Sequence, residues 1–228
     1  MSVQDEITGH FDAIAAEYDY WKKKNWYYYR ELESIASREV RPSDRVLDAG
    51  CGTGSMLAAV SSAEGVGVDI SPQMIQIANV RHGDQKNLSF YATDIVDFST
   101  DRPFEVILFF DVIEHLEKPA EVIKTLSRLV KKNGKLIITM ANPAWEPILM
   151  LGEKLKLKMK EGPHHRISIG AFRAMLERAG FHITKTETRL LIPKYIPFIS
   201  NLINKLAARI PIVRDWGVIK VFIASRVA

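Results

Sequence analysis

The chain of 228 residues lacks several features that would place it in a specialised class. It has a single cysteine, Cys51, so no internal disulfide can form and we expect a reducing compartment. The formal net charge of only +4 does not favour a nucleic-acid-binding protein. No long hydrophobic run exists, because the most apolar tract, 190–203, is interrupted by Pro193, Lys194 and Pro197. Residues 1–12 contain acids where a secretion signal would be basic and apolar, so we expect a cytoplasmic protein.

What the sequence does contain is an alternation of two patterns. Short apolar runs predict strands, and segments with apolar residues every three to four positions predict helices. The expected strands are 45–49, 66–70, 88–92, 104–110, 134–140, 181–191 and 217–225. The expected helices are 55–63, 72–82, 119–130 and 168–180, with Asn133-Gly134 as a helix end. This order predicts an α/β fold, a mostly parallel sheet with helices on both faces.

Three segments depart from the alternation. Residues 1–40 are aromatic-rich and helical in pattern, and we expect them to form a lid. The connections 141–167 and 192–216 are long and apolar, which is typical of functional insertions. We therefore predict one domain over 1–228, with a core at 41–140 and the two insertions on the substrate side.

The stretch 46-VLDAGCGTG-54 forms a glycine turn between a predicted strand and helix. Such turns bind polar or anionic ligands with their amides. The spacing of Gly50, Gly52 and Gly54 is not the G-x-G-x-x-G of dinucleotide sites, which argues against a nicotinamide oxidoreductase. Asp48 would repel a pyrophosphate, but it suits a ligand with an ammonium or sulfonium charge.

Three further aspartates end the next strands along the chain. Asp69 could accept hydrogen bonds from a ribose diol, and Asp94 could accept one from an adenine amino group. Asp111 follows the fourth strand. Each aspartate alone could be a helix cap, but with Asp48 they make four at matching positions, which indicates a nucleotide-like ligand at one sheet edge.

These motifs, with VGVDISPQM, YATDI, FEVILFFDVIEHLEKP and NGKLIITMANP, resemble the class I S-adenosylmethionine-dependent methyltransferases over roughly residues 40–145. The resemblance implies a Rossmann-like seven-stranded sheet whose last strand is antiparallel. It implies S-adenosylmethionine as methyl donor and S-adenosylhomocysteine as product. The residues that it assigns to the methionine moiety, ribose, adenine and methyl end are Asp48, Gly50, Cys51, Gly52, Asp69, Ile70, Met74, Asp94, Ile95 and Asp111. The segment 11–19 resembles a covering helix from which Tyr18 closes over the cofactor; core packing is the alternative role of Tyr18.

Histidines are the candidate general bases, because an imidazole can accept a proton near neutral pH. His115 follows the fourth strand, and His165, beside His164, ends the first insertion. Ordering of loops is the alternative role for each. These histidines, together with Asp111 and Glu114, could also ligate a metal. In metal-free methyltransferases that this chain resembles, however, residues such as Asp111 and Glu114 contact the cofactor or order a loop, so no metal site is assigned.

The acceptor is expected to be a small organic, glycan-type or lipid-linked molecule, methylated on oxygen rather than nitrogen. The two insertions weakly resemble a bacterial subgroup associated with glycosyltransferases. Residues 198–210 form an apolar helical stripe beside Lys205 and Arg209, which could lie on an anionic membrane or line the pocket. An RNA methyltransferase and an inactive cofactor-binding protein stay as alternatives, and the oligomeric state is open.

Overall fold

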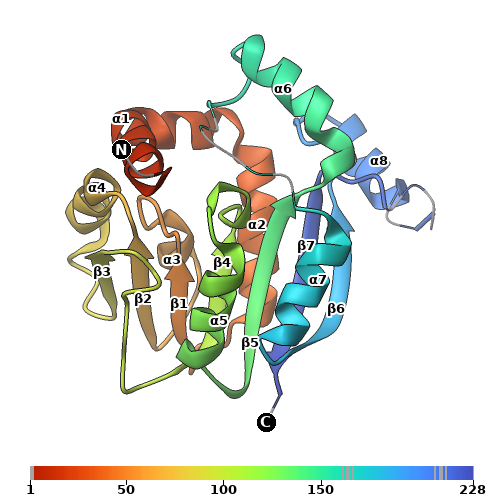
Figure 1. Cartoon of the computed structure of the whole chain (residues 1–228). Coiled ribbons are helices and arrows are strands. Elements are labelled where there is room, and N and C mark those ends of the chain that lie inside the picture. Colours follow the sequence, from red (N-terminus) through yellow and green to blue (C-terminus); the bar gives the residue numbers. More distant parts are fainter. Residues whose placement is uncertain are drawn as a thin grey trace.

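The computed structural model describes residues 3–160, 162, 165, 167–207, 209, 210, 213 and 215–227. Its centre is one seven-stranded sheet in the order β3-β2-β1-β4-β5-β7-β6 (Figure 1). The strands are β1 Arg45–Ala49, β2 Glu64–Asp69, β3 Leu88–Ala92, β4 Phe104–Phe110, β5 Val130–Ala141, β6 Phe181–Arg189 and β7 Ile219–Arg226. Only β7 runs antiparallel to its neighbours, β5 and β6. This confirms the predicted Rossmann-like sheet.

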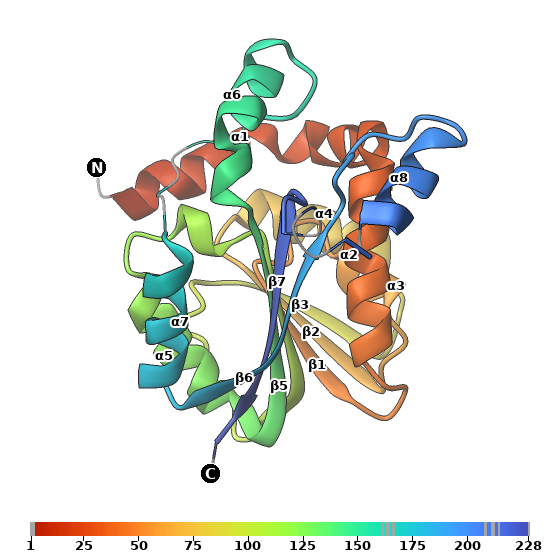
Figure 2. The ribbon, with the colours of Figure 1, turned by 90° about the vertical axis from the view of Figure 1, so that its right-hand side faces the viewer.

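Helices cover both faces of the sheet, as Figure 2 shows edge-on. One face is covered by α5 (Pro119–Leu129) and α7 (Ile169–Arg178), and the other by α2 (Trp26–Glu39), α3 (Ser55–Ala59) and α4 (Pro72–His82). Side chains of a strand alternate between the two faces. Along β4, Ile107 and Phe109 therefore join the first hydrophobic core, whereas Val106 and Leu108 join the second. All four are at most 2% exposed, which explains why this strand reads as a continuous apolar run.

The remaining elements lie at the carboxyl ends of the strands (Figures 1 and 2). Helix α1 (Val3–Lys24) crosses this end of the sheet, as the predicted lid would. The first insertion begins with η2 (Pro143–Trp145) and α6 (Glu146–Lys154), and the second contains α8 (Ile199–Ala207). The short helix η1 (Ile113–His115) follows β4. The insertions therefore lie at the edge of the sheet where ligands bind in this class of fold.

Two local predictions were wrong. The helix expected over 55–63 ends at Ala59, because the chain turns to an extended conformation at Val60 (φ −94°, ψ 140°). Asn133-Gly134 does not end a helix: α5 already stops at Leu129, and the pair lies within β5. There Asn133 has φ 61°, and the pairing of β4 with β5 shifts register. The dipeptide therefore forms an irregularity in a strand rather than a helix end.

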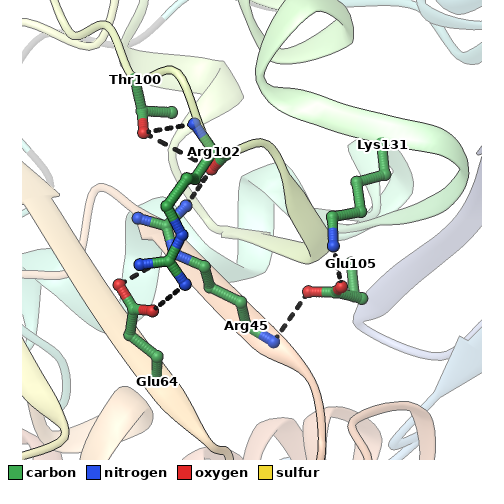
Figure 3. Close-up of polar contacts among 6 residues, drawn as sticks. All are labelled: Arg45, Glu64, Thr100, Arg102, Glu105 and Lys131. Atoms are coloured by element: carbon green, nitrogen blue, oxygen red, sulfur yellow. Dashed lines mark hydrogen bonds and ion pairs between the residues drawn. The ribbon is translucent and has the colours of Figure 1, made fainter.

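At the opposite end of the sheet, ion pairs connect the amino-terminal ends of four strands (Figure 3). The Arg45 guanidinium lies 2.8 Å from Glu64, which Arg102 also contacts at 2.9 Å. The Arg45 backbone amide donates to Glu105 at 2.9 Å, and Lys131 pairs with the same carboxylate. These contacts tie together the starts of β1, β2, β4 and β5, far from the carboxyl ends.

Candidate functional site

The glycine turn after β1 depends on left-handed backbone. Gly50, Gly52 and Gly54 have φ of 80°, 52° and 76°, values that residues with a Cβ rarely adopt. A Cβ on Gly50 would lie 2.4 Å from a methyl carbon of Val112. The Gly50 amide donates to the Val68 carbonyl at 2.7 Å, which fixes the turn against β2. The turn thus leaves a concave surface that a ligand can approach closely.

Asp48 is the most unusual group at this surface. It is only 2% exposed, and its Oδ2 has no hydrogen-bond partner among the described residues. Burial raises the pKa of Asp48 from 3.8 to about 7; the Lys22 charge opposes this rise and Asp69 adds to it. A buried carboxylate oxygen without a donor is unfavourable unless a ligand supplies one. Asp48 therefore fits the ammonium group of an amino-acid-like ligand.

Asp69 is held by two backbone amides. Its Oδ2 accepts from Gly52 at 2.7 Å and its Oδ1 from Ser71 at 2.9 Å. Burial is the largest cause of its raised pKa, and these two amides oppose the rise. The carboxylate is therefore fixed between the glycine turn and the start of α4, and its remaining lone pairs are available to a diol.

The third strand delivers Asp94. Its Oδ1 accepts from the Val96 amide at 2.9 Å, and its Oδ2 accepts from the side-chain amide of Gln4 on α1. Gln4 thus makes the kind of contact expected of an adenine amino group. The apolar walls beside it are provided by Ile70, Met74 and Ile95.

Asp111 is the last of the four aspartates, and its backbone is left-handed, with φ 54°. Its Oδ1 accepts from Thr139 Oγ1 at 2.7 Å, and its Oδ2 accepts from the Tyr28 hydroxyl at 2.8 Å. Burial raises the pKa of Tyr28, and the Asp111 charge adds to it, so this phenol stays a donor. The carboxylate is therefore oriented by β5 and α2 together.

The two candidate bases lie on one wall. His115 belongs to η1, and its ring meets that of Phe11 edge-on with centroids 5.4 Å apart. The His165 amide donates to the Glu114 carbonyl at 2.6 Å, which brings the first insertion against η1. His164 lies outside the described residues. Among those that are described, no group of three or more His, Cys, Asp or Glu side chains could hold a metal ion.

All of these groups share one cavity of about 660 Å³. It is lined by every residue that the sequence predicted for the site, namely Tyr18, Asp48, Gly50, Cys51, Gly52, Asp69, Ile70, Met74, Asp94, Ile95, Asp111, His115 and His165. Tyr18 covers the glycine turn, since a Cβ on Gly52 would lie 3.2 Å from its ring. Cys51 is buried and unpaired, and burial raises its pKa, so it stays a thiol. The roles assigned to these residues stay predictions.

Sequence reasoning missed two residues of the site, Lys22 of α1 and Tyr28 of α2. Lys22 lies in the cavity with its ammonium 5.3 Å from the Tyr18 ring centroid and beside Ser55, and burial lowers its pKa. Four residues separate it from Tyr18, which places both on one helix face, a signal that the sequence did contain. Tyr28 of α2 had no comparable signal, because only the docking of α2 brings it to Asp111.

Helix α1 is fastened over the cofactor side by polar contacts. Asp12 accepts from the Ser71 hydroxyl at 2.5 Å and from the Gln73 amide at 3.2 Å, at the start of α4. Asp19 accepts from the Thr53 hydroxyl at 2.8 Å, in the glycine turn. The lid is therefore bonded to the loops that follow β1 and β2.

None of the described residues in 198–210 lines this cavity, which argues against the alternative that their stripe lines the pocket. Phe198, Leu202 and Leu206 are 91%, 57% and 48% exposed instead. Polar side chains of α8 form the attachment to the body of the protein.

Comparisons with known proteins identify the family of the chain. The model of a family described as "Methyltransferase domain" matches residues 20–186. A curated relative, the ubiquinone biosynthesis O-methyltransferase of Xanthomonas campestris, is 25% identical over 142 residues, 59% of each chain. The matched region thus spans less than two thirds of that relative.

Two of the solved structures that share the fold illustrate the likeness. A chain of the structure described as the complex between the Haloferax volcanii Trm112 methyltransferase activator and "the putative methyltransferase" has a TM-score of 0.72 and 21% identity over 96% of this chain and 98% of its own. The N-methyltransferase NodS of Bradyrhizobium japonicum, with bound S-adenosyl-l-homocysteine, has a TM-score of 0.69 and 16% identity over 97% and 98%. With the family match over most of its length, the chain belongs to the class I S-adenosylmethionine-dependent methyltransferases.

Proposed function

We propose that the protein transfers a methyl group from S-adenosylmethionine to an oxygen of a small acceptor with a large apolar part, such as a lipid-linked molecule. The observation that carries this proposal is the lining of the cavity. Besides the residues predicted for the cofactor, its wall includes side chains of α1, α2, β4 and the first insertion. Many of these are aromatic or aliphatic, namely Trp21, Tyr29, Phe110, Trp145, Leu149 and Met159, and we call the part that they line the chamber.

The residues present fit the cofactor. Asp48 would hold its ammonium group, Asp69 its ribose diol and Asp94 the edge of its adenine. Gly50 and Gly52 would allow the backbone close approach. When bound, S-adenosylmethionine would supply a methyl group on a sulfonium, from which the neutral thioether S-adenosylhomocysteine is a good leaving group.

The chain's own contribution at the methyl end is positioning and exclusion of water. Asp111 is fixed by Thr139 and Tyr28 and can orient an acceptor hydroxyl. Phe11 of α1 packs on His115 and covers this part of the cavity. Holding the reacting groups in line can supply a large share of the acceleration.

A base is needed if the acceptor oxygen carries a proton. Asp111, His115 and His165 all line the cavity, and the His165 amide donates to the carbonyl of Glu114, the residue before His115. We propose His115 as the base that accepts the hydroxyl proton, with His165 as the second candidate. The relative named as an O-methyltransferase supports oxygen, whereas NodS keeps nitrogen as the alternative atom.

The acceptor class can be tested with labelled cofactor and a cell extract separated into lipid, glycan, RNA and small-molecule pools. We expect label in the lipid or apolar small-molecule pool. Label confined to RNA would replace the proposal by an RNA methyltransferase. Tight cofactor binding without label in any pool would indicate a cofactor-binding protein without activity. We propose a cytoplasmic location with contact to the membrane periphery.

The base can be tested with His115→Ala and His165→Ala. Loss of a general base lowers turnover by about 10²- to 10⁴-fold while the cofactor Kd stays near that of the parent protein. His182→Ala is a matched control, because His182 is exposed on β6 and does not line the cavity. Normal turnover in His115→Ala would remove it as the base.

A further inference from the structure

We propose that the protein docks on an anionic lipid bilayer through a surface built by α6 and α8. This docking surface consists of the exposed apolar residues in two segments, 148–157 and 195–206, together with Ile210. The inference depends on the proposed function only for the route that the acceptor takes; the docking itself depends on the surface.

The exposure of apolar residues is concentrated in the two insertions. Of the 18 large hydrophobic residues that are exposed in the described part of the chain, 13 lie in 141–167 and 192–216. The first segment contributes Ile148, Met150, Leu151, Leu155 and Leu157, each at least 45% exposed. Apolar residues scattered singly on a surface need no explanation, but a contiguous apolar group marks an interaction site.

The polarity of α8 is inverted relative to an ordinary surface helix. Polar residues attach it to the body: Asn201 accepts from the Tyr27 hydroxyl of α2 at 2.9 Å, the side-chain amide of Asn204 donates to the same hydroxyl at 3.1 Å, and Ser200 is fully buried. Asn204 bonds to the backbone of Ile192 at 2.9 and 3.0 Å. Its apolar residues Ile199, Leu202 and Leu206 face outward, with about half of each side chain exposed. A helix that is attached by hydrogen bonds and presents leucines to solvent has its apolar face available for a partner.

The two segments are connected to each other. Lys194 donates to the Leu157 carbonyl at 3.3 Å and to Asn25 at 2.5 Å, which joins the end of the first segment to the start of the second. Helix α6 lies beyond the carboxyl ends of the strands, and α8 lies beside α2 near the same end of the sheet (Figures 1 and 2). The protein can therefore present both segments at the same end.

Charge identifies the partner. The two insertions hold nine basic and four acidic residues, a net charge of +5, although the whole chain has only +4. Lys154, Lys156, Lys205 and Arg209 are exposed beside the apolar residues. An anionic bilayer offers both an apolar interior and negative headgroups to such a surface. A second copy of the chain would instead bring two positive surfaces together.

The acceptor cavity opens at this surface. Ile148, Met150 and Leu157 line the cavity and are also exposed, so its wall continues into the docking surface. A lipid-linked acceptor could thus enter the chamber without exposing its apolar part to water. No helix in the described part of the chain is long and apolar enough to span a bilayer.

Co-sedimentation with lipid vesicles tests the inference. We expect the full chain to pellet with vesicles that contain phosphatidylglycerol, and to stay in solution with pure phosphatidylcholine or in 0.5 M salt. The double variant Leu202→Glu, Leu206→Glu should lower the partition coefficient by about tenfold or more, because it removes apolar contact and adds repulsion. Val80→Glu is the matched control, since Val80 is 82% exposed on α4, and it should bind as the parent does.

Two outcomes would overturn the docking. One is equal pelleting of the parent chain and the double variant. The other is a dimer in sedimentation velocity that the double variant abolishes, without vesicle binding by the parent. Calorimetry with S-adenosylhomocysteine should give the same affinity for the double variant, which shows that it folds. Vesicle binding without methyl transfer would contradict the proposed function alone, and transfer without vesicle binding would contradict the docking alone.

Discussion

The buried carboxylate of Asp48 predicts that cofactor binding depends on pH near neutrality. Its pKa is raised to about 7 by burial, so below pH 7 the free protein holds mostly the protonated form. The ammonium group of the ligand binds the ionised carboxylate, so a protonated Asp48 must lose its proton for the ligand to bind. With a pKa of about 7, the affinity at pH 6 should be about tenfold weaker than at pH 8, which corresponds to about 1.4 kcal/mol.

Isothermal calorimetry with S-adenosylhomocysteine can measure this dependence between pH 6 and 8. At pH 6 about 0.9 proton should be released per molecule bound, because roughly nine tenths of Asp48 is protonated beforehand. Measurements in buffers of different ionisation enthalpy give that number directly. The Asp48→Asn variant keeps the shape of the side chain but does not ionise. Its affinity for S-adenosylhomocysteine should therefore be lower than that of the parent protein at pH 8, and it should not change between pH 6 and 8.

Two variants distinguish the contribution of Asp48 to the pH dependence from that of the histidines in the cavity. Asp48→Asn retains His115 and His165, so any slope that it keeps belongs to other groups. Lys22→Met should move the midpoint to higher pH, because the Lys22 charge lowers the pKa of Asp48. An affinity of the parent protein that does not change between pH 6 and 8, or an undiminished slope in Asp48→Asn, would refute the reasoning.

Three further predictions concern the same site, and the first has a control, Gly9→Ala, outside it. Gly50→Ala forces an L residue to φ 80° and into contact with its neighbour, and it should lower the free energy of unfolding by about 1–3 kcal/mol in thermal melts. Gly9→Ala, in open space within α1, should instead raise it by about 0.5–1 kcal/mol. Asp69→Ala should weaken S-adenosylhomocysteine binding by about 1.5–3 kcal/mol in calorimetry; an unchanged Kd would exclude Asp69 from the ribose site. Tyr28→Phe removes a donor to Asp111 and should lower kcat with little change in cofactor Kd, so a proportional loss of both would mean that α2 is displaced.

The sheet and the row of aspartates could be predicted from the sequence for one physical reason. Buried parallel strands are continuous apolar runs, and their carboxyl ends meet at one edge. Asp48, Asp69, Asp94 and Asp111 each stand directly at such an end or just after it. The positions of the strands therefore determine the arrangement of the site, without knowledge of tertiary packing.

Other parts of the site depend on packing between distant segments. Tyr28 reaches Asp111 only because α2 packs against the sheet, and no local pattern encodes that arrangement. The stripe of α8 is a clear helical pattern, but periodicity does not say which face points inward. Here hydrogen bonds of Ser200 and Asn204 decide the orientation and turn the leucines outward.

The contacts of α1 bear on the residence time of the product. The Ser71 hydroxyl accepts from the Met74 amide, which caps α4, and at the same time donates to Asp12 of the lid. Asp19 joins the lid to the glycine turn through Thr53. Displacement of α1 must break hydrogen bonds at both places before spent cofactor can leave. We therefore expect opening of the lid to limit turnover once the chemistry is fast, and a viscosity-dependent kcat would be its signature.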